Sequence, residues 1–197
     1  IDTWYGIPKG NLVLTDLAAS GASEEEQVEI YGQAAVDAAA RLRAGSDGNG
    51  ERRTYMCHGF CELGALPLAE ELGKIRTWMD RNPNEVIVII VQDAITPEDT
   101  DVAFEESGLR DLVYHHTPGQ PFPTLREMIA TGERVVVMAE KDAGTELDWY
   151  LQAYDFTQET PVRALKPSDF SCQPDRGGTG KPFFLFNNWI EKTQPLV

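Results

Sequence analysis

The sequence predicts an α/β fold whose parallel strands curl into a barrel. Segments with strand and helix patterns alternate from about residue 52 onward, which implies βα units with right-handed crossovers. Residues 86–91 form a continuous β-branched run, which is typical of a strand buried on both faces in a parallel sheet. No Gly-x-Gly-x-x-Gly sequence follows any strand, so a dinucleotide-binding sheet lacks its main signal and a barrel is favoured.

The N-terminal part of the chain has the weaker patterns. We expect a short extended piece over residues 1–10 that ends in a loop from residue 5, followed by weak alternation over residues 11–17. One helix is expected from about residue 24 to residue 44, because the three glutamates in its first turn complement the helix dipole. Its buried stripe consists of Val28, Tyr31, Ala35, Ala38, Ala39 and Leu42.

The elements after residue 52 follow in a regular order. We expect strands at 53–58, 85–92, 133–138 and 182–186, helices at 67–81, 97–107, 123–129 and 147–154, and irregular chain at 157–181. With the N-terminal pieces this gives about five or six strands, which is short of the eight that a closed barrel needs. We therefore expect the barrel to be incomplete at its N-terminus, with its first units before Ile1.

Each clear strand ends in polar residues. These residues are His58, Gln92 with Asp93, Glu140 with Lys141, and Asn187 with Asn188. The carboxyl ends of parallel strands lie together at one rim, where ligands bind in barrels and open α/β sheets. A histidine at such a position is well suited to exchange a proton near neutral pH.

The charge of the chain limits the classes of partner. The 197 residues include 17 Lys and Arg against 32 Asp and Glu, for a formal net charge of −15. This acidic balance disfavours nucleic acid as a partner and also broad adsorption to anionic lipid. The acidic net charge is still compatible with the binding of a single lipid headgroup in a pocket. No apolar run approaches the roughly 20 residues that span a bilayer.

Three cysteines, Cys57, Cys61 and Cys172, allow two interpretations. Cys57 and Cys61 bracket His58, which is compatible with a zinc site, but no second cluster supplies the remaining ligands. A local disulfide between Cys57 and Cys61 is favoured and fits an exported protein. Cys172 is then left over.

Several stretches in a fixed order resemble a known family. They are Ile-Asp-Thr-Trp-Tyr-Gly (1–6), Cys-His-Gly-Phe-Cys-Glu-Leu-Gly (57–64), Asn-Pro-Asn-Glu-Val (82–86) before Gln-Asp (92–93), Pro-Thr-Leu-Arg-Glu-Met-Ile (123–129), Arg-Val-Val-Val-Met-Ala-Glu (134–140), Glu-Thr-Pro (159–161), Ser-Cys (171–172) before Arg-Gly (176–177) and Leu-Phe-Asn-Asn-Trp (185–189). Together they resemble the phosphatidylinositol-specific phospholipase C X-domain superfamily of phospholipase C-like phosphodiesterases, in its bacterial, actinobacterial-type branch. The resemblance covers nearly all of the chain except residues from about 9 to 50.

The resemblance implies an irregular TIM-like barrel and a reaction. Members of the family cleave phosphodiester headgroups with two histidines as general base and acid, through a cyclic phosphate intermediate. His58 is similar to the second of these histidines, and Asp2 to the acidic residue at the end of the second strand. In calcium-dependent relatives that acidic position helps to hold the metal, so Asp2 and Asp93 are candidates for catalysis and for one divalent cation, Ca²⁺ or Mg²⁺.

The chain also departs from the family pattern. The first histidine of the family lies in a Thr-His-Asn-type motif on the first strand, and this sequence contains no such motif. The chain therefore resembles one partial barrel domain, residues 1–197, that lacks its first strand and helix and carries an acidic helical insert at about 9–50. His115 and His116 do not fit the place of the first histidine, and we expect them in an exposed loop.

Further candidates for substrate contact are Glu140, Lys141, Arg176, Asn188 and Trp189. For Glu140 with Lys141 the alternative is a solvated pair at a strand end, and for Arg176 it is a mobile loop, because the Walker spacing is absent.

We interpret the chain as a phospholipase C-like phosphodiesterase that acts on a lipid or its headgroup, outside the cytoplasm, either secreted or membrane-anchored. The alternative is a catalytically silent barrel that serves as a binding or structural subunit of a cell-envelope or membrane complex. A metal-dependent glycerophosphodiesterase would need a cluster of carboxylates that the sequence does not supply.

Overall fold

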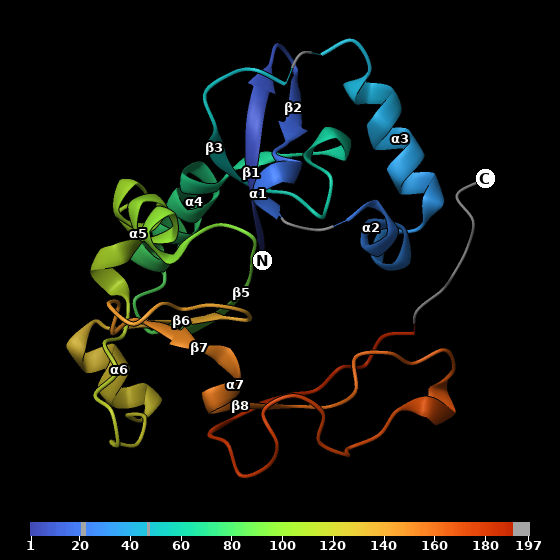
Figure 1. Ribbon diagram of the computed structural model, residues 1–197. Coiled ribbons are helices and arrows are strands. Elements are labelled where there is room, and N and C mark those ends of the chain that lie inside the picture. Colours follow the sequence, from blue (N-terminus) through green and yellow to red (C-terminus); the bar gives the residue numbers. More distant parts are fainter. Residues whose placement is uncertain (21–22, 47, 191–197) are drawn as a thin grey trace.

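One curled mixed sheet dominates the structure (Figure 1). The computed structural model describes residues 1–20, 23–46 and 48–190, and within these ranges the sheet has seven strands in the order β4-β3-β1-β5-β6-β7, with β2 paired to β1. The strands are β1 Asp2–Lys9, β2 Leu12–Thr15, β3 Arg53–Met56, β4 Leu66–Pro67, β5 Ile87–Asp93, β6 Val135–Ala139 and β7 Tyr150–Gln152. A separate parallel pair consists of β8 Thr157–Glu159 and β9 Phe183–Leu185.

Helices cover the sheet and lie beyond its end (Figure 1). They are α1 Leu17–Ser20, α2 Glu24–Tyr31, α3 Gln33–Arg43, α4 Leu68–Arg81, α5 Pro97–Glu106, α6 Leu125–Thr131 and α7 Ala153–Phe156, with single 3-10 turns η1 Cys61–Leu63, η2 Leu109–Leu112 and η3 Pro167–Asp169. No helix in the described ranges is long and apolar enough to cross a bilayer.

The expected TIM-like parallel barrel is wrong. Among the described strands of the seven-stranded sheet, only β1, β5, β6 and β7 pair in parallel, whereas β1 with β2, β1 with β3, and β3 with β4 are antiparallel. Short connections explain the pairs β1–β2 and β3–β4, because a parallel pair needs a crossover of about a dozen or more residues. β1 turns directly into β2 through Gly10, at φ 61°, and Asn11. β3 and β4 are likewise joined by a short loop that leaves no room for a crossover helix.

β1 joins the parallel and antiparallel parts of the sheet. Asp2 and Thr3 pair with Gln92 and Asp93 at the carboxyl end of β5, while the rest of β1 extends past that end as an antiparallel ribbon. Gly6 lies in the middle of this ribbon, opposite Thr15 of β2 on one side and Arg53 of β3 on the other. A Cβ at Gly6 would lie 2.5 Å from a Val13 side-chain carbon, so the ribbon is close-packed at this point.

The main core lies between the parallel strands and helices α4 and α5. The apolar residues of α4 recur every three or four positions, so they form one face that packs on the sheet. Leu72 and Met79 of α4 are fully buried against Val91 of β5 and Val137 of β6. All five residues of β6 are buried, since a second apolar cluster that includes Met128 covers its other face.

Several sequence predictions need correction. β5 was expected to be buried on both faces, but Val88 is 45% exposed. The single helix over residues 24–44 is two helices, because Gly32 adopts φ 82° and breaks the hydrogen-bonding pattern after the capped helix α2. The loop expected from residue 5 is part of β1, and the short helix expected at 147–154 contains strand β7. Strand β8 lies in the segment 157–181 that was expected to be irregular, and α1 and β4 were not expected. Helices α4, α5 and α6 and strands β3, β6 and β9 lie close to their expected positions.

The described part of residues 9–50 forms the end of β1, strand β2 and the helices α1, α2 and α3, and α2 and α3 lie on the β2 side of the ribbon (Figure 1). Their designation as an insert within one domain stays a prediction.

The packing of α4 can be tested with Leu72→Ala. Leu72 is fully buried, so we expect a loss of about 2–5 kcal/mol in the free energy of unfolding, from lost burial and the cavity left behind. Urea unfolding measures this as a lower midpoint at unchanged slope. Leu42→Ala on α3, where the leucine is 47% exposed, is the control and should cost much less. Equal losses in both variants would contradict the packing described for α4.

Candidate functional site

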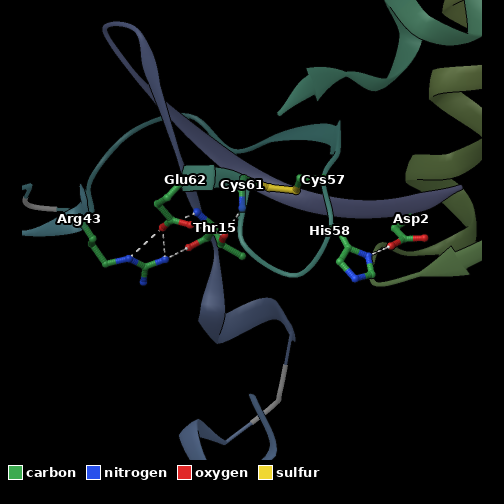
Figure 2. The surroundings of a disulfide bond; sticks show 7 residues. All are labelled: Asp2, Thr15, Arg43, Cys57, His58, Cys61 and Glu62. Atoms are coloured by element: carbon green, nitrogen blue, oxygen red, sulfur yellow. Dashed lines mark hydrogen bonds and ion pairs between the residues drawn. A yellow bond between two sulfur atoms is a disulfide. The ribbon is translucent and has the colours of Figure 1, made fainter. Parts of the chain in front are cut away.

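His58 and Asp2 are hydrogen-bonded although 56 positions separate them in the sequence (Figure 2). The distance between His58 Nδ1 and Asp2 Oδ2 is 2.5 Å. The antiparallel register explains the contact. Met56 at the end of β3 lies opposite Thr3, so the chain that leaves β3 passes the start of β1. The two strongest candidates from the sequence are therefore in direct contact.

The arrangement leaves one nitrogen of the imidazole available. An ionised carboxylate accepts hydrogen bonds only, so Asp2 orients His58 with its proton on Nδ1. The His58 side chain is 80% exposed and that of Asp2 is 26% exposed. Nε2 can thus meet a ligand from solvent, which is the geometry that a general acid or base needs.

The loop that carries His58 is cross-linked at its base. Cys57 and Cys61 form a disulfide, which confirms the predicted pairing, and both residues are buried. Cys172 is a free, exposed cysteine. The zinc interpretation of the two bracketing cysteines is therefore excluded in this structure. The disulfide fixes the backbone on both sides of His58.

Glu62 anchors the same loop through a buried charge (Figure 2). Its side chain has no exposed surface, and its carboxylate accepts hydrogen bonds from Thr15 N at 3.0 Å and Thr15 Oγ1 at 2.7 Å. Arg43, at the end of α3, forms an ion pair with the same carboxylate and also donates to the Thr15 carbonyl. The Cys61 amide donates to Thr15 Oγ1 at 2.8 Å. These contacts satisfy a charge that would otherwise be costly to bury.

Asp93 lies apart from this pair. It is 5% exposed, and its two oxygens accept the backbone amides of Lys141 and Asp142, each at 2.9 Å. In the parallel register Asp2 is opposite Gln92, whereas Asp93 is opposite Thr3. Because side chains alternate between the faces of a sheet, Asp2 and Asp93 point to opposite faces.

One cation shared by Asp2 and Asp93 therefore does not fit this geometry. In the described part of the chain, no group of three or more His, Cys, Asp or Glu side chains could hold a metal ion. Asp93 instead fixes the loop after β6.

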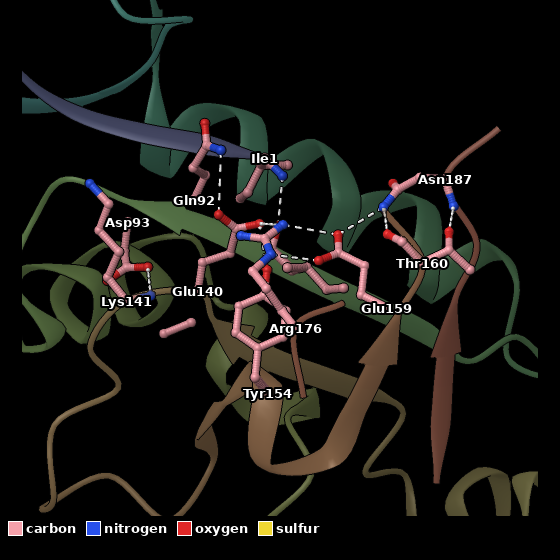
Figure 3. A network of polar contacts seen from close by, with 12 residues as sticks. Ile1, Gln92, Asp93, Glu140, Lys141, Tyr154, Glu159, Thr160, Arg176 and Asn187 are labelled. Carbon is pink, nitrogen blue, oxygen red and sulfur yellow. Dashed lines mark hydrogen bonds and ion pairs between the residues drawn. The ribbon is translucent and has the colours of Figure 1, made fainter. Parts of the chain in front are cut away.

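A second polar cluster continues along the same sheet edge (Figure 3). Gln92, the register partner of Asp2, donates from Nε2 to Glu140 Oε2 at 3.3 Å. The Tyr154 hydroxyl donates to Glu140 Oε1 at 3.1 Å, and Arg176 lies 3.6 Å from the same oxygen. Gln92 thus links the His58–Asp2 pair to the residues after β6 and β7.

Arg176 is the cation of this cluster. Its guanidinium forms a two-point ion pair with Glu159, at 2.5 Å and 2.9 Å, and lies over the Tyr154 ring at 4.5 Å. Glu159 is 2% exposed and also accepts a hydrogen bond from Asn187 Nδ2 at 3.0 Å. Burial, and then the Glu140 carboxylate, raise the pKa of Tyr154, so its phenol stays protonated at neutral pH. The loop that holds Arg176 is therefore tied to β8.

Sequence reasoning selected some members of this cluster and missed others. Glu140 and Arg176 belong to it, whereas Lys141, Asn188 and Trp189 are exposed. Tyr154, Glu159 and Asn187 were not chosen. Asn187 directly follows the last expected strand, so its position was a usable signal. Glu159 lies in a segment with no strand pattern of its own, and its signal was its place in the Glu-Thr-Pro stretch (159–161) of the family resemblance.

His116 is also placed differently from the prediction. It is buried rather than in an exposed loop, and its ring stacks on Phe122 at 4.9 Å and meets Phe156 edge-on at 4.8 Å. His115 is exposed, with Nδ1 2.7 Å from Asp148 Oδ1. This segment follows the bridge between Val113 and Val135, at the end of β6 opposite to Glu140.

Comparison with known proteins gives one family match and two relatives. The model of the family PI-PLC X 1 matches residues 16–191. A "PI-PLC X domain-containing protein 1" of Arthroderma benhamiae is 32% identical over 148 residues, which cover 68% of this chain and 48% of the relative. An "Uncharacterized secreted protein" of the same fungus is 30% identical over 132 residues, which cover 62% of this chain and 29% of the relative. The chain thus corresponds to half or less of either relative, and no solved structure matches it.

Glu62→Gln tests the anchor of the His58 loop. Gln keeps the shape but removes the charge that Arg43 and the two Thr15 donors satisfy, so we expect a loss of about 1–3 kcal/mol in the free energy of unfolding. Urea unfolding measures it. Glu51→Gln is the matched control, because Glu51 is 80% exposed and its contact with Arg53 is 3.4 Å long. An unchanged unfolding midpoint in Glu62→Gln would contradict the anchoring role.

Proposed function

The chain belongs to the PI-PLC X domain family, and we propose that it takes part in phosphodiester cleavage with His58 as general acid or base. The observation that carries the proposal is the short contact between His58 Nδ1 and Asp2 Oδ2 beneath an imidazole that is 80% exposed. Acid–base catalysis needs a titratable group that is both oriented and accessible, and His58 meets both requirements.

The proposed reaction is attack of an internal hydroxyl of the headgroup on phosphorus. The hydroxyl loses its proton to a base, the new P–O bond closes a cyclic phosphate, and the bond to the leaving oxygen breaks as an acid protonates that oxygen. This reaction has two proton transfers, one to the base and one from the acid. A single imidazole can carry out one of them, and we assign that transfer to His58. Asp2 keeps the imidazole in the required orientation and tautomer.

The second polar cluster is the proposed contact region for the headgroup. Glu140 accepts hydrogen bonds, the phenol of Tyr154 stays protonated, and Arg176 carries positive charge at 40% side-chain exposure. Such a set suits a headgroup that combines several hydroxyls with an anionic phosphate. Lys141, Asn188 and Trp189 are exposed near the ends of β6 and β9 and remain candidates for contacts with the rest of a lipid substrate.

We also propose an extracytoplasmic location. The disulfide between Cys57 and Cys61 is of a kind that persists in oxidising compartments, and one relative is described as secreted. Both relatives are fungal, so the expected bacterial, actinobacterial-type branch stays a prediction.

A catalytically silent binding domain is the second candidate, and one observation favours it. Arg176 already forms ion pairs with both Glu140 and Glu159, so this part of the edge carries an excess of negative charge. A phosphate would have to draw the guanidinium away from these carboxylates. A neutral or cationic ligand would meet less repulsion there.

His58→Ala tests the enzymatic proposal. We expect release of a phosphodiester headgroup from phosphatidylinositol-type substrates to fall by about 10²–10⁴-fold, because the positioned proton-transfer group is lost. Asp2→Asn should lower the rate by a smaller factor. The rates are measured on the natural polypeptide that contains this chain, with His115→Ala as the control. Turnover that survives His58→Ala unchanged would overturn the assignment, and no turnover in any of the proteins would favour the binding domain.

A chelator tests whether a divalent cation takes part. Asp2 and Asp93 point to opposite faces of the sheet, so we expect headgroup release in EDTA to stay within about twofold of the untreated rate. Loss of turnover in EDTA, restored by added Ca²⁺ or Mg²⁺, would contradict this expectation and would require a metal site built from other residues.

A further inference from the structure

Tyr31, the last residue of α2, lies against the His58 loop. Its ring meets the His58 ring edge-on, with centroids 5.5 Å apart and planes at 88°. It also meets Phe60 edge-on at 5.3 Å. Helix α2 thus contributes a side chain to the surroundings of the exposed imidazole of His58.

The backbone of the His58 loop is shaped to admit this ring. Gly59 adopts φ 74°, and a Cβ at this position would lie 2.4 Å from Cζ of Tyr31. Any other residue at position 59 would displace the Tyr31 ring and strain the backbone. The contact is therefore a close packing of side chain on backbone, and not a chance proximity on the surface.

Two anchors hold α3, and with it α2, against the residues that follow His58 in the loop. Val36 and Ala39 of α3 are buried against Phe60, with Tyr31 packed on the same cluster. Arg43 at the end of α3 is tied to the buried Glu62. Because both anchors contact the loop that carries His58, the position of Tyr31 relative to the imidazole is fixed at two points.

His58 needs such a support. One hydrogen bond to Asp2 fixes the distance to one ring nitrogen, but an imidazole with 80% exposure can still turn about its side-chain bonds. The Tyr31 ring lies edge-on beside the imidazole, with centroids 5.5 Å apart, so it reduces the space into which the His58 ring can turn. The ring, and not the hydroxyl, makes this contact.

The hydroxyl of Tyr31 contributes no hydrogen bond that holds the described part of the fold together. It makes no hydrogen bond to any residue in the described ranges. Burial, and then the Asp2 carboxylate, raise the pKa of Tyr31, so the phenol is neutral at physiological pH. The phenol of Tyr31 therefore adds no negative charge beside the Asp2–His58 pair.

We propose that Tyr31 is a positioning residue for His58, which makes the α2–α3 segment part of the reaction centre. The proposal rests on the proposed function. Small displacements of a proton-transfer group lower rates by large factors. Loss of the Tyr31 ring should therefore lower kcat more than it changes KM.

The test compares three variants of the natural polypeptide that contains this chain. Tyr31→Leu removes the ring, Tyr31→Phe keeps the ring and removes the hydroxyl, and Ile30→Ala changes the neighbouring residue, which is 67% exposed. We expect kcat for headgroup release to fall about tenfold or more in Tyr31→Leu, with KM within about twofold. Tyr31→Phe and Ile30→Ala should stay close to the unmodified protein in both constants.

NMR of the His58 ring protons gives a readout that does not need turnover. In the unmodified protein we expect nuclear Overhauser contacts between the rings of Tyr31 and His58. The His58 resonances should keep their positions in Tyr31→Phe and move in Tyr31→Leu, where the edge-on ring is lost. Because the contacts are measured in the unmodified protein, the proposal stays testable even if Tyr31→Leu does not fold.

The outcomes separate the two proposals. Turnover that depends on His58 but is unchanged in a folded Tyr31→Leu protein would overturn the positioning role and leave the proposed function standing. Absence of turnover in all proteins, with the Tyr31–His58 contacts present, would overturn the function and leave only the structural contact. Absence of these contacts in the unmodified protein would overturn the positioning role directly.

Discussion

The buried carboxylate of Glu62 is the interaction on which the candidate site depends. A charge with no exposed surface needs hydrogen-bond partners, and Glu62 finds them in Thr15 of β2 and Arg43 of α3, while the Cys61 amide of the same loop donates to Thr15 Oγ1. Loss of any one partner would leave the others desolvated and unsatisfied. The cluster therefore fixes three separate segments at once. His58 lies four residues before Glu62, on a loop that the disulfide closes, so its position follows from that of the cluster.

The sequence predicts those elements whose local pattern decides their structure. Helix α4 has one continuous apolar face, and β5 and β6 are β-branched runs, so both kinds of element lie where their periodicity predicts. The local pairing of Cys57 with Cys61 followed from their spacing. The choice of His58 followed from its position at a strand end together with the family resemblance, and the choice of Asp2 followed from the resemblance alone. The structure brings the two into contact.

The remaining features depend on pairings between distant segments. Nothing in the sequence of β3 states that it runs antiparallel to β1, and this direction is what turns the expected barrel into a mixed sheet. The register of β1 on β5 decides that Asp2 and Asp93 face opposite sides, and a shift of one residue would reverse that result. Glu159 and Tyr154 are recognisable as site residues only once the Arg176 loop has folded onto β8. Contacts between segments that are distant in the sequence produce no periodic pattern of residues along it.

The position of Gly6 between Thr15 and Arg53 has an evolutionary consequence. The chain leaves the ribbon on one side of this glycine and returns on the other, and α1, α2 and α3 lie in the excursion between the two points. Since the ends of the excursion are already held together, each doubling of its length adds only about 0.6 kcal/mol of closure entropy. Insertions or deletions in the parts of this excursion that lie away from Tyr31 and Arg43 can therefore be accommodated while Asp2 stays opposite Gln92. The length of this segment can then vary independently of the imidazole and the two residues that support its loop.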